Sequence, residues 1–252
     1  MLRCFYTAGT GMLVQRDRMD VLANNLTNVE TAGYKSDSLI SSTFREMVME
    51  RLHDPGIVST STIVGPLGTG THIEEVYTTF TQGNIEGTGR LCDLALVGDG
   101  FFTVSTPEGD RYTRDGSFFV NSDGYLVTSE GRYVQGIKGR IEVGSDDFSV
   151  DQAGNVYVGG TYEDRLRIMR FEDPAGLRKD GGNLYEHVEG PGANEAADTI
   201  VKQGALEGSN VDSAQELTRM LSVRNAYTIN QRVLGMVDKS LEKAVNEVGR
   251  VG

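Results

Sequence analysis

The residues of this chain that could do chemistry are few, and their spacing predicts no catalytic or metal site. The three histidines, His53, His72 and His187, are far apart in the sequence. No His-Glu-x-x-His pattern occurs, and no cysteine and histidine spacing suits zinc. We therefore expect each histidine to lie on the surface or in a loop.

Two pairs of adjacent acidic residues, Glu74-Glu75 and Asp146-Asp147, could be considered as a general acid and base. Neighbouring residues of a strand point to opposite faces, so a solvated strand edge explains these pairs better. The run Asn121-Ser122-Asp123-Gly124 resembles the start of a calcium loop. It lacks the bidentate glutamate at the EF-hand position, and a hairpin turn explains it fully.

The glycine-rich run Gly65-Pro-Leu-Gly68-Thr-Gly70 resembles a phosphate-binding loop. No Lys-Ser/Thr pair follows it, and it does not lie between a strand and a helix, so turn chemistry accounts for it. The sequence thus predicts no catalytic, cofactor-binding or metal-binding residue, no cofactor and no enzymatic activity.

The two cysteines, Cys4 and Cys92, are isolated and far apart. We expect two buried or partly buried thiols, and a disulfide between them is the alternative.

Composition excludes some classes of function. The 252 residues include 36 acidic and 24 basic side chains, and the net charge of -12 would repel a phosphate backbone, so nucleic-acid binding is not expected. No run approaches the roughly 18 apolar residues of a membrane span. Residues 1–10 lack the apolar region of a cleaved secretory signal. The sequence predicts a cytosolic protein, or one exported by a route that needs no such signal.

The elements that position these residues are clearest at the C-terminus, where apolar residues alternate three and four apart. A period of 3.5 residues keeps one stripe facing a partner helix. This predicted seam consists of Met220, Val223, Tyr227, Asn230, Leu234, Val237, Leu241, Ala244 and Val248. Asn230, its one strongly polar member, is expected to fix the register, and a surface position on a rotated helix is the alternative. The helix should begin near residues 210–212, since Ser213 and Glu216 have capping-box spacing.

A shorter seam lies at the other end, where periodicity predicts a helix over residues 10–30 that should end near the asparagine-rich run 24–28. Met12, Met19 and Leu26 are seven residues apart, as are Leu22 and Val29. Helices at both ends of the chain, each with one apolar stripe, predict that the two ends pair as a coiled coil or bind other copies.

The middle of the chain has the pattern of short β-strands. Residues 37–52 give mixed signals, and Phe44, Met47, Val48 and Leu52 could line a helical face. Residues 54–70 predict an extended loop or a hairpin arm. From His72 onward the period is two, with expected strands near 76–80, 91–97, 101–104, 149–150, 156–158 and 166–171. Turn dipeptides recur at Glu108-Gly109, Asp115-Gly116, Asp123-Gly124 and Glu130-Gly131, which favours a compact antiparallel β domain.

The predicted class is α+β, with terminal helices paired as a coiled coil and a central antiparallel all-β domain. We assign residues 1–35 and 205–252 to the helical part, 36–75 to a linker or extended arm, and 76–204 to a β-rich outer domain.

Several segments of the sequence carry a family resemblance. The first is Met19-Asp-Val-Leu-Ala-Asn-Asn-Leu-Thr-Asn-Val-Glu-Thr-Ala-Gly-Tyr-Lys35. Three central runs follow, Leu94-Ala-Leu-Val-Gly-Asp-Gly-Phe-Phe102, Tyr112-Thr-Arg-Asp-Gly-Ser-Phe118 and Gly124-Tyr-Leu-Val127, and the last is Gly204-Ala-Leu-Glu-Gly-Ser-Asn-Val211. Together they closely resemble the signatures of the flagellar rod, hook and hook-associated family. The residues that match its terminal motifs are Ala23, Asn24, Asn25, Asn28, Gly33, Tyr34, Glu207, Gly208, Ser209 and Asn210.

The resemblance implies a structural subunit of the flagellar basal-body rod. The chain has the length of a rod protein, and residues 64–77 and 206–210 resemble the proximal rod proteins most and the distal rod proteins second. The implied partners are copies of the chain, homologous rod proteins, the flagellar type III export apparatus and the ring proteins around the rod. The implied location is the periplasmic rod, reached without a cleaved signal peptide.

A glycan-binding module or an enzyme built on the β domain is the alternative from a different class. A binding module should show clustered exposed aromatics, whereas the Tyr and Phe residues here alternate as strand core.

Overall fold

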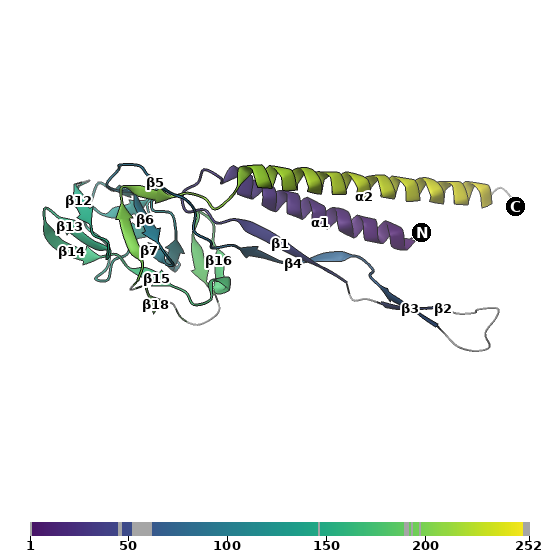
Figure 1. Ribbon diagram of the computed structural model, residues 1–252, viewed down its shortest axis with the longest axis horizontal. Helices are drawn as coiled ribbons and strands as arrows, with labels where there is room; N and C mark the ends of the chain where they lie inside the picture. Colours follow the sequence, from purple (N-terminus) through teal and green to yellow (C-terminus); the bar gives the residue numbers. More distant parts are fainter. Residues whose placement is uncertain are drawn as a thin grey trace. The chain divides into compact units, whose positions relative to one another are not determined.

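The computed structural model describes residues 2–44, 47–51, 62–145, 147–188, 192, 194–196 and 198–248. His53, Leu52, Asp146 and residues 54–61 of the expected arm lie outside the described residues. The chain forms two units (Figure 1). Unit 1 contains Met1–Leu26, Asp37–Tyr77 and Ser213–Gly252, and unit 2 contains Thr27–Ser36 and Thr78–Asp212.

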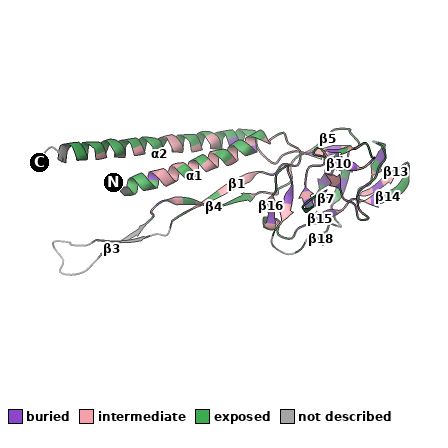
Figure 2. Cartoon of the chain, turned by 180° about the vertical axis from the view of Figure 1, so that it is seen from behind, coloured by how far each residue is buried: buried purple, intermediate pink, exposed green. Residues whose placement is uncertain are grey.

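Unit 1 contains two long helices, α1 (Leu2–Thr27) and α2 (Ser213–Val248), which lie side by side in both views of the chain (Figures 1 and 2). Strand β1 (Asp37–Thr43) pairs with β4 (Thr71–Thr78). The hydroxyl-rich and β-branched composition of both strands disfavours a helix.

The hairpin alternative for the arm is correct where the structure describes it. Strand β2 (Met47–Arg51) pairs antiparallel with β3 (Thr62–Leu67). The suggested helical face within residues 37–52 is therefore wrong, because β1 and β2 occupy most of that range.

The predicted terminal helices exist, and both the end of α1 at Thr27 and the start of α2 at Ser213 lie close to the expected places. Helix α1 begins eight residues earlier than expected, at Leu2, and ends at Thr27, so Val29 lies in the turn beyond it and is not on the helix. Residues 28–35 and 205–212, which the sequence assigned to the helical part, are not helical. They form turns, extended segments and strand β20 (Ala205–Glu207), and they belong to unit 2.

Unit 2 is largely antiparallel, so the α+β class with a β-rich centre is confirmed. Its main sheet has the strand order β16-β17-β8-β7-β11-β10-β9, with β15 also paired to β7 and β18 paired to β15. The strands of this sheet are β7 (Phe101–Thr106), β8 (Gly109–Thr113), β9 (Phe118–Val120), β10 (Leu126–Thr128), β11 (Tyr133–Val134), β15 (Ile168–Arg170), β16 (Leu177–Lys179), β17 (Tyr185–His187) and β18 (Asn194–Glu195).

Three smaller groups of strands complete unit 2. A three-stranded sheet runs β12-β13-β14, and two pairs are β19-β6 and β20-β5. Their bounds are β5 (Ile85–Gly87), β6 (Leu94–Val97), β12 (Phe148–Val150), β13 (Asn155–Val158), β14 (Thr161–Arg165) and β19 (Ile200–Gln203). A short 3-10 helix, Pro174–Gly176, precedes β16.

The hydrophobic core lies in unit 2, where buried residues concentrate (Figure 2). Its main cluster includes Leu94, Phe102, Phe118, Val134 and Ile141, and Phe102 meets Phe118 edge to face at 5.2 Å. Leu94–Leu96 in β6 and Phe101–Val104 in β7 are buried without a break, so both faces of these strands are covered, whereas exposed Phe119 follows buried Phe118 in β9.

Three of the four predicted turn glycines have positive φ, Gly109, Gly124 and Gly131. Gly116 does not, and the primed turn expected there is wrong. Instead, Gly116 accepts a hydrogen bond from Leu94 N (3.0 Å), and a Cβ built on Gly116 would lie 1.6 Å from Leu94 O. Gly116 is therefore required for close backbone approach and not for its φ angle.

Among the described residues, no disulfide joins the cysteines. Cys92 is buried as expected, whereas Cys4 is exposed, so the expectation of a buried or partly buried thiol is wrong for Cys4. No helix in the described ranges is long and apolar enough to cross a membrane.

Candidate functional site where the signature segments meet

Residues from the N-terminal, central and C-terminal signature segments meet in unit 2 around a buried group of charges. Lys35 Nζ lies 2.5 Å from Glu207 Oε1, and Arg114 Nη1 lies 3.2 Å from Glu207 Oε2. The Lys35 and Glu207 side chains are 0% exposed, and that of Arg114 is 4% exposed. One residue comes from each of the N-terminal, central and C-terminal signatures.

Backbone contacts position Lys35, Arg114 and Glu207, which we call the triad. Gly33 N donates to Glu207 O (2.7 Å), which joins the N-terminal signature to the end of β20. Gly33 has φ +65°, and a Cβ built there would lie 2.3 Å from the carbonyl carbon of Arg114. Gly33 therefore meets two demands at once, a left-handed conformation and direct backbone contact with the central signature.

The remaining polar contacts of the triad are also internal. Lys35 Nζ donates to Thr81 O (2.8 Å), and Glu207 Oε1 accepts from Gly83 N (3.0 Å). Arg114 Nη2 donates to Gly98 O (2.9 Å). A carboxylate held in this way is not available to a substrate, so the arrangement holds chain segments together.

Burial sets the electrostatics of the triad. It lowers the pKa of Lys35 below 10.5, and the attraction and hydrogen bond of Glu207 oppose this shift. Burial likewise lowers the pKa of Arg114 below its usual value, again against the attraction of Glu207. A buried charge without its partner is strongly destabilising, so Glu207 is the residue on which both cations depend.

Asn210 makes a second connection between the signatures. Its Nδ2 donates to Thr79 O (2.7 Å) and Thr81 Oγ1 (3.0 Å), and its Oδ1 accepts from Ser36 N (2.8 Å). Gly208 N donates to Asn84 O (2.7 Å). The C-terminal signature is thus bonded both to residues 79–84 and to the end of the N-terminal signature.

Three further motif residues lie in unit 2. Tyr34 is buried, and Lys179 Nζ lies 4.2 Å from the centre of its ring. Asn28 Oδ1 accepts from Thr31 Oγ1 (3.2 Å), and Ser209 Oγ accepts from Val211 N (3.2 Å). These bonds shape the turns of the N-terminal and C-terminal signatures on either side of the triad. We call the meeting point of the three signatures in unit 2 the junction.

The comparisons with known proteins match the same segments. A model described as flagella basal body rod protein matches residues 5–35, and one described as flagellar hook protein FlgE/F/G D1 domain matches residues 95–158. A third, flagellar basal body rod FlgEFG protein C-terminal, matches residues 202–247.

Full-length relatives agree with these models. The flagellar hook-basal body complex protein FlhO of Bacillus subtilis is 31% identical over 100% of both chains. The flagellar basal-body rod protein FlgG of Borreliella burgdorferi is 34% identical over 98% of both. The chain belongs to the flagellar basal-body rod protein family. The FlgF protein of Caulobacter vibrioides is 32% identical over 100% of this rod protein and 99% of its own length.

The motif residues at the end of α1 belong to unit 1 of this rod protein. Asn25 is buried, its Nδ2 donates to Asp37 O (2.8 Å), and its Oδ1 accepts from Asp37 N (2.9 Å). Asn25 Nδ2 also lies 3.4 Å from Glu216 Oε2, in the first turn of α2. Asn25 thereby joins α1, β1 and α2, whereas Ala23 and Asn24 are exposed.

The predicted seam of α2 lies on the least exposed side of that helix. Every seam residue from Met220 to Ala244 is half-buried, and between Leu217 and Asn246 only Ala226 and Thr228 share that degree of burial. Val248 ends α2, and its side chain lies outside the described part. Asn230 faces α1, because a Cβ built on Gly11 would lie 3.1 Å from Asn230 Nδ2.

On α1, the seam residues Met12, Met19, Leu22 and Leu26 are half-buried. The most buried apolar residues of α1 are Ala8 and Val14, which the sequence did not single out. The role of both seams in assembly stays a prediction.

Apolar residues on α2 are exposed outside the seam, namely Leu217, Leu221, Ile229, Val233, Met236 and Val245. Of these, the sequence pattern indicated only Leu217 and Leu221, as a drift of the stripe. Lys35 and Arg114 were not singled out, although each is a charged residue within a specific motif. No local pattern distinguishes Lys35 and Arg114 from the other charged residues of the two runs that contain them, which are Asp20, Glu30 and Asp115.

The histidines that the structure describes have ordinary packing roles. His72 lies within hydrogen-bonding distance of Ser42 Oγ (3.2 Å) and stacks on Phe44. His187 stacks on Phe171. No group of three or more potential metal ligands occurs within the described ranges.

Proposed function

We propose that this rod protein is a subunit of the proximal rod, the FlgF type, which assembles helically into the shaft that transmits torque from motor to hook. The terminal helices pair as an inner coiled-coil layer, and the β-rich unit forms the outer part of the wall. Neighbouring copies meet through different surfaces, so the assembly does not close into a ring and grows as a helical tube. Close packing gives such a tube low compressibility, and rotation is passed along it.

The observation that best supports assembly as the function is the surface of α2. Over 30 residues from Leu217 to Asn246, no described side chain of this helix is fully buried. Isolated helices without a packed face are marginal in water, because most helix stability in proteins comes from packing of an apolar face. A helix of this length with one half-buried stripe needs further chains to cover it.

We further propose that the chain is exported through the flagellar type III apparatus, without a cleaved signal, to the periplasmic rod. Its partners there are its own copies, homologous rod proteins and the surrounding ring proteins. The family membership and the apolar helix surfaces support this route.

The distal rod position, the FlgG type, is the second candidate, since several full-length relatives carry the name FlgG. Co-purification decides between the two positions. Basal bodies isolated from cells with a tagged chain are dissociated in steps from the distal end, and the fractions are probed. Release together with the proximal rod components supports the proposal, and release with the distal rod contradicts it.

An enzyme or glycan-binding module in unit 2 is the alternative from another class. The full-length chain is screened against a glycan array and for glycan hydrolysis. Specific binding or turnover would contradict a purely structural role.

A further inference from the structure

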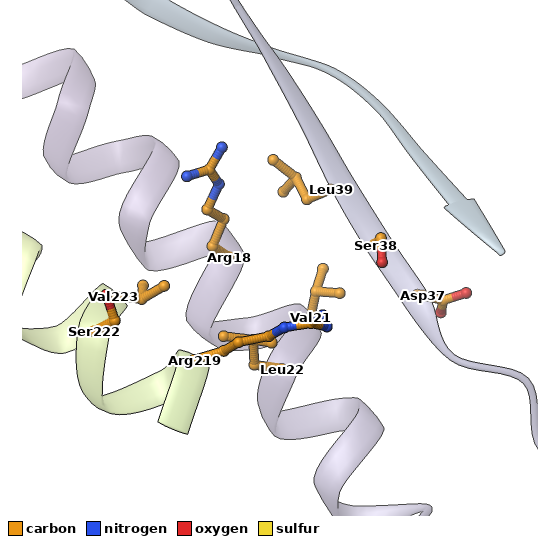
Figure 3. Close-up of a pocket in the computed structure, with 9 residues that line it drawn as sticks. All are labelled: Arg18, Val21, Leu22, Asp37, Ser38, Leu39, Arg219, Ser222 and Val223. Carbon is orange, nitrogen blue, oxygen red and sulfur yellow. The ribbon is translucent and has the colours of Figure 1, made fainter. Parts of the chain in front are cut away.

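A pocket of about 250 Å³ lies inside unit 1, where α1, β1 and α2 come together. Its apolar walls are Val21 and Leu22 of α1, Leu39 of β1 and Val223 of α2. Figure 3 shows Leu39 pointing from β1 toward α1, opposite Arg18 and Val21. Sites for small molecules usually occupy about 300–1,000 Å³, so this pocket suits one or two side chains better than a cofactor.

The rim of the pocket carries two arginines, Arg18 and Arg219, and one carboxylate, Asp37. Arg18 Nη2 donates to Ser41 Oγ (2.7 Å), and Arg219 Nη1 donates to Glu216 Oε1 (2.7 Å). A guanidinium has five N–H donors, so each arginine keeps donors for a further acceptor. The pocket therefore fits an apolar side chain that has carboxylates beside it.

An exposed surface of α1 has that chemistry. Leu13 of α1 is 52% exposed, and Asp17 and Asp20 follow at i+4 and i+7 on the same face. Asp20 is exposed, while Asp17 is paired with Arg16 at 2.9 Å.

Three other exposed apolar groups on the two helices have the wrong charge. Leu221 precedes Arg224 by three residues, and Ile229 and Met236 flank Arg232 at three and four residues. Phe5 and Tyr6 lie beside Arg3. Each of these groups would bring a cation to Arg18 and Arg219.

We propose that the pocket between α1, β1 and α2 receives Leu13 of a second copy of this chain, with Asp17 and Asp20 of that copy binding Arg219 and Arg18. This inference rests on the proposed assembly function and names one of its contacts. The faces of α1 that carry Leu13 and the pocket residues are about 120° apart around the helix, at 100° per residue. The pocket and Leu13 thus lie on different faces of α1, an arrangement that suits a heterologous contact repeated from copy to copy.

Site-directed cross-linking tests the contact in cells that make the chain. Two differently tagged copies are co-expressed, both with Cys4→Ser, one with Leu13→Cys and the other with Ser222→Cys on the pocket wall. After oxidation, basal bodies are isolated, and we expect a disulfide-linked dimer that carries both tags. Gln231→Cys, an exposed position elsewhere on α2, replaces Ser222→Cys in the control pair and should give no such dimer.

Charge reversal tests the rim. Asp20→Lys in the Leu13→Cys copy, or Arg18→Glu in the Ser222→Cys copy, should each lower the cross-linking yield about tenfold, since juxtaposed like charges are costly. Both changes together should restore at least part of the yield. A double reversal that gives no more cross-linking than either single change overturns the charge pairing.

The outcomes separate this contact from the wider function. Both tags present in basal bodies without a dimer of residues 13 and 222 overturns the pocket contact and leaves the rod function standing. A cross-link from residue 222 to a different rod protein overturns the second copy as the occupant. Absence of both tags from basal bodies overturns the proposed function, and this inference with it.

Discussion

Lys35 Nζ and Glu207 Oε1 lie 2.5 Å apart although 172 residues separate them in the sequence. Both side chains are inaccessible to solvent, and Arg114 shares the same carboxylate. Each of these residues belongs to a signature of the flagellar rod family. The motifs that identify the family therefore have a physical role, which is to join the N-terminal, central and C-terminal segments within unit 2.

Loss of the shared carboxylate should destabilise unit 2 severely. Glu207→Gln leaves Lys35 and Arg114 buried without a negative partner, and breaking a buried pair in this way costs about 3–5 kcal/mol. Urea unfolding followed by tyrosine fluorescence measures the change. Glu142→Gln, an exposed glutamate of the same unit, is the control and should change stability by about 0.5 kcal/mol or less. Equal effects of the two substitutions would contradict the role of the triad.

Gly33 and Gly131 form a matched pair that separates backbone strain from close packing. Both have positive φ, +65° and +78°, but only Gly33 has backbone atoms where a Cβ would be placed. Gly131→Ala should cost about 1–2 kcal/mol, the cost of a left-handed residue with a side chain. Gly33→Ala should cost at least about 3 kcal/mol, because residues 114 and 115 must also move. Similar costs at both positions would mean that the contact with Arg114 is easily relaxed.

Asp115 in the central signature should make stability depend on pH. Burial raises its pKa above 3.8, and hydrogen bonds from Ser117 N and Oγ oppose this shift. Between 3.8 and the pKa in the folded state, the folded chain binds more protons than the unfolded one. The free energy of unfolding therefore falls as pH rises through this interval.

Asp115→Asn tests this dependence, because the amide does not titrate and keeps an oxygen that can accept from Ser117. The stability of the variant relative to the wild type should increase across this interval and then level off at higher pH. Urea unfolding of both proteins from about pH 3 to pH 7 gives the two curves. Parallel curves would show that Asp115 has the same pKa in both states.

The C-terminal half of α2 should be the regular element least protected from hydrogen exchange before assembly. Glu216 is its one buried side chain among the described residues, and it lies in the first turn. Local opening free energy follows burial of apolar contacts. Hydrogen exchange of the monomer should show weak protection for residues 231–246 and strong protection for strands such as β7. Uniformly strong protection along α2 would mean that its seam is already satisfied within one chain.

Local patterns in the sequence predicted the features that depend on local physics. The 3.5-residue period marked the half-buried stripe of α2, and Gly109, Gly124 and Gly131 occur at turns because positive φ is a local requirement. Val29 was misplaced because apolar spacing continues past Thr27, where the helix ends.

Contacts between distant segments were beyond such patterns. Nothing near Arg114 in the sequence indicates Glu207, and the close approach of Gly116 to Leu94 O depends on tertiary structure alone. The family motifs did include Gly33, Glu207 and Asn210, which all lie in the junction. What the motifs could not supply was the reason, which is that these residues contact one another.

The α2 seam is the central element of the proposed assembly, and Leu234→Asp tests it most directly. A carboxylate in the half-buried stripe should prevent packing of the helices between copies and leave unit 2 folded, because Leu234 belongs to unit 1. Gln231→Asp places the same charge on the exposed side of α2. Quantitative immunoblots of isolated basal bodies compare the two variants with the wild type. We predict wild-type amounts of Gln231→Asp and almost no Leu234→Asp, with loss of motility in the latter. Incorporation of Leu234→Asp at the wild-type level, with normal motility, would contradict the account.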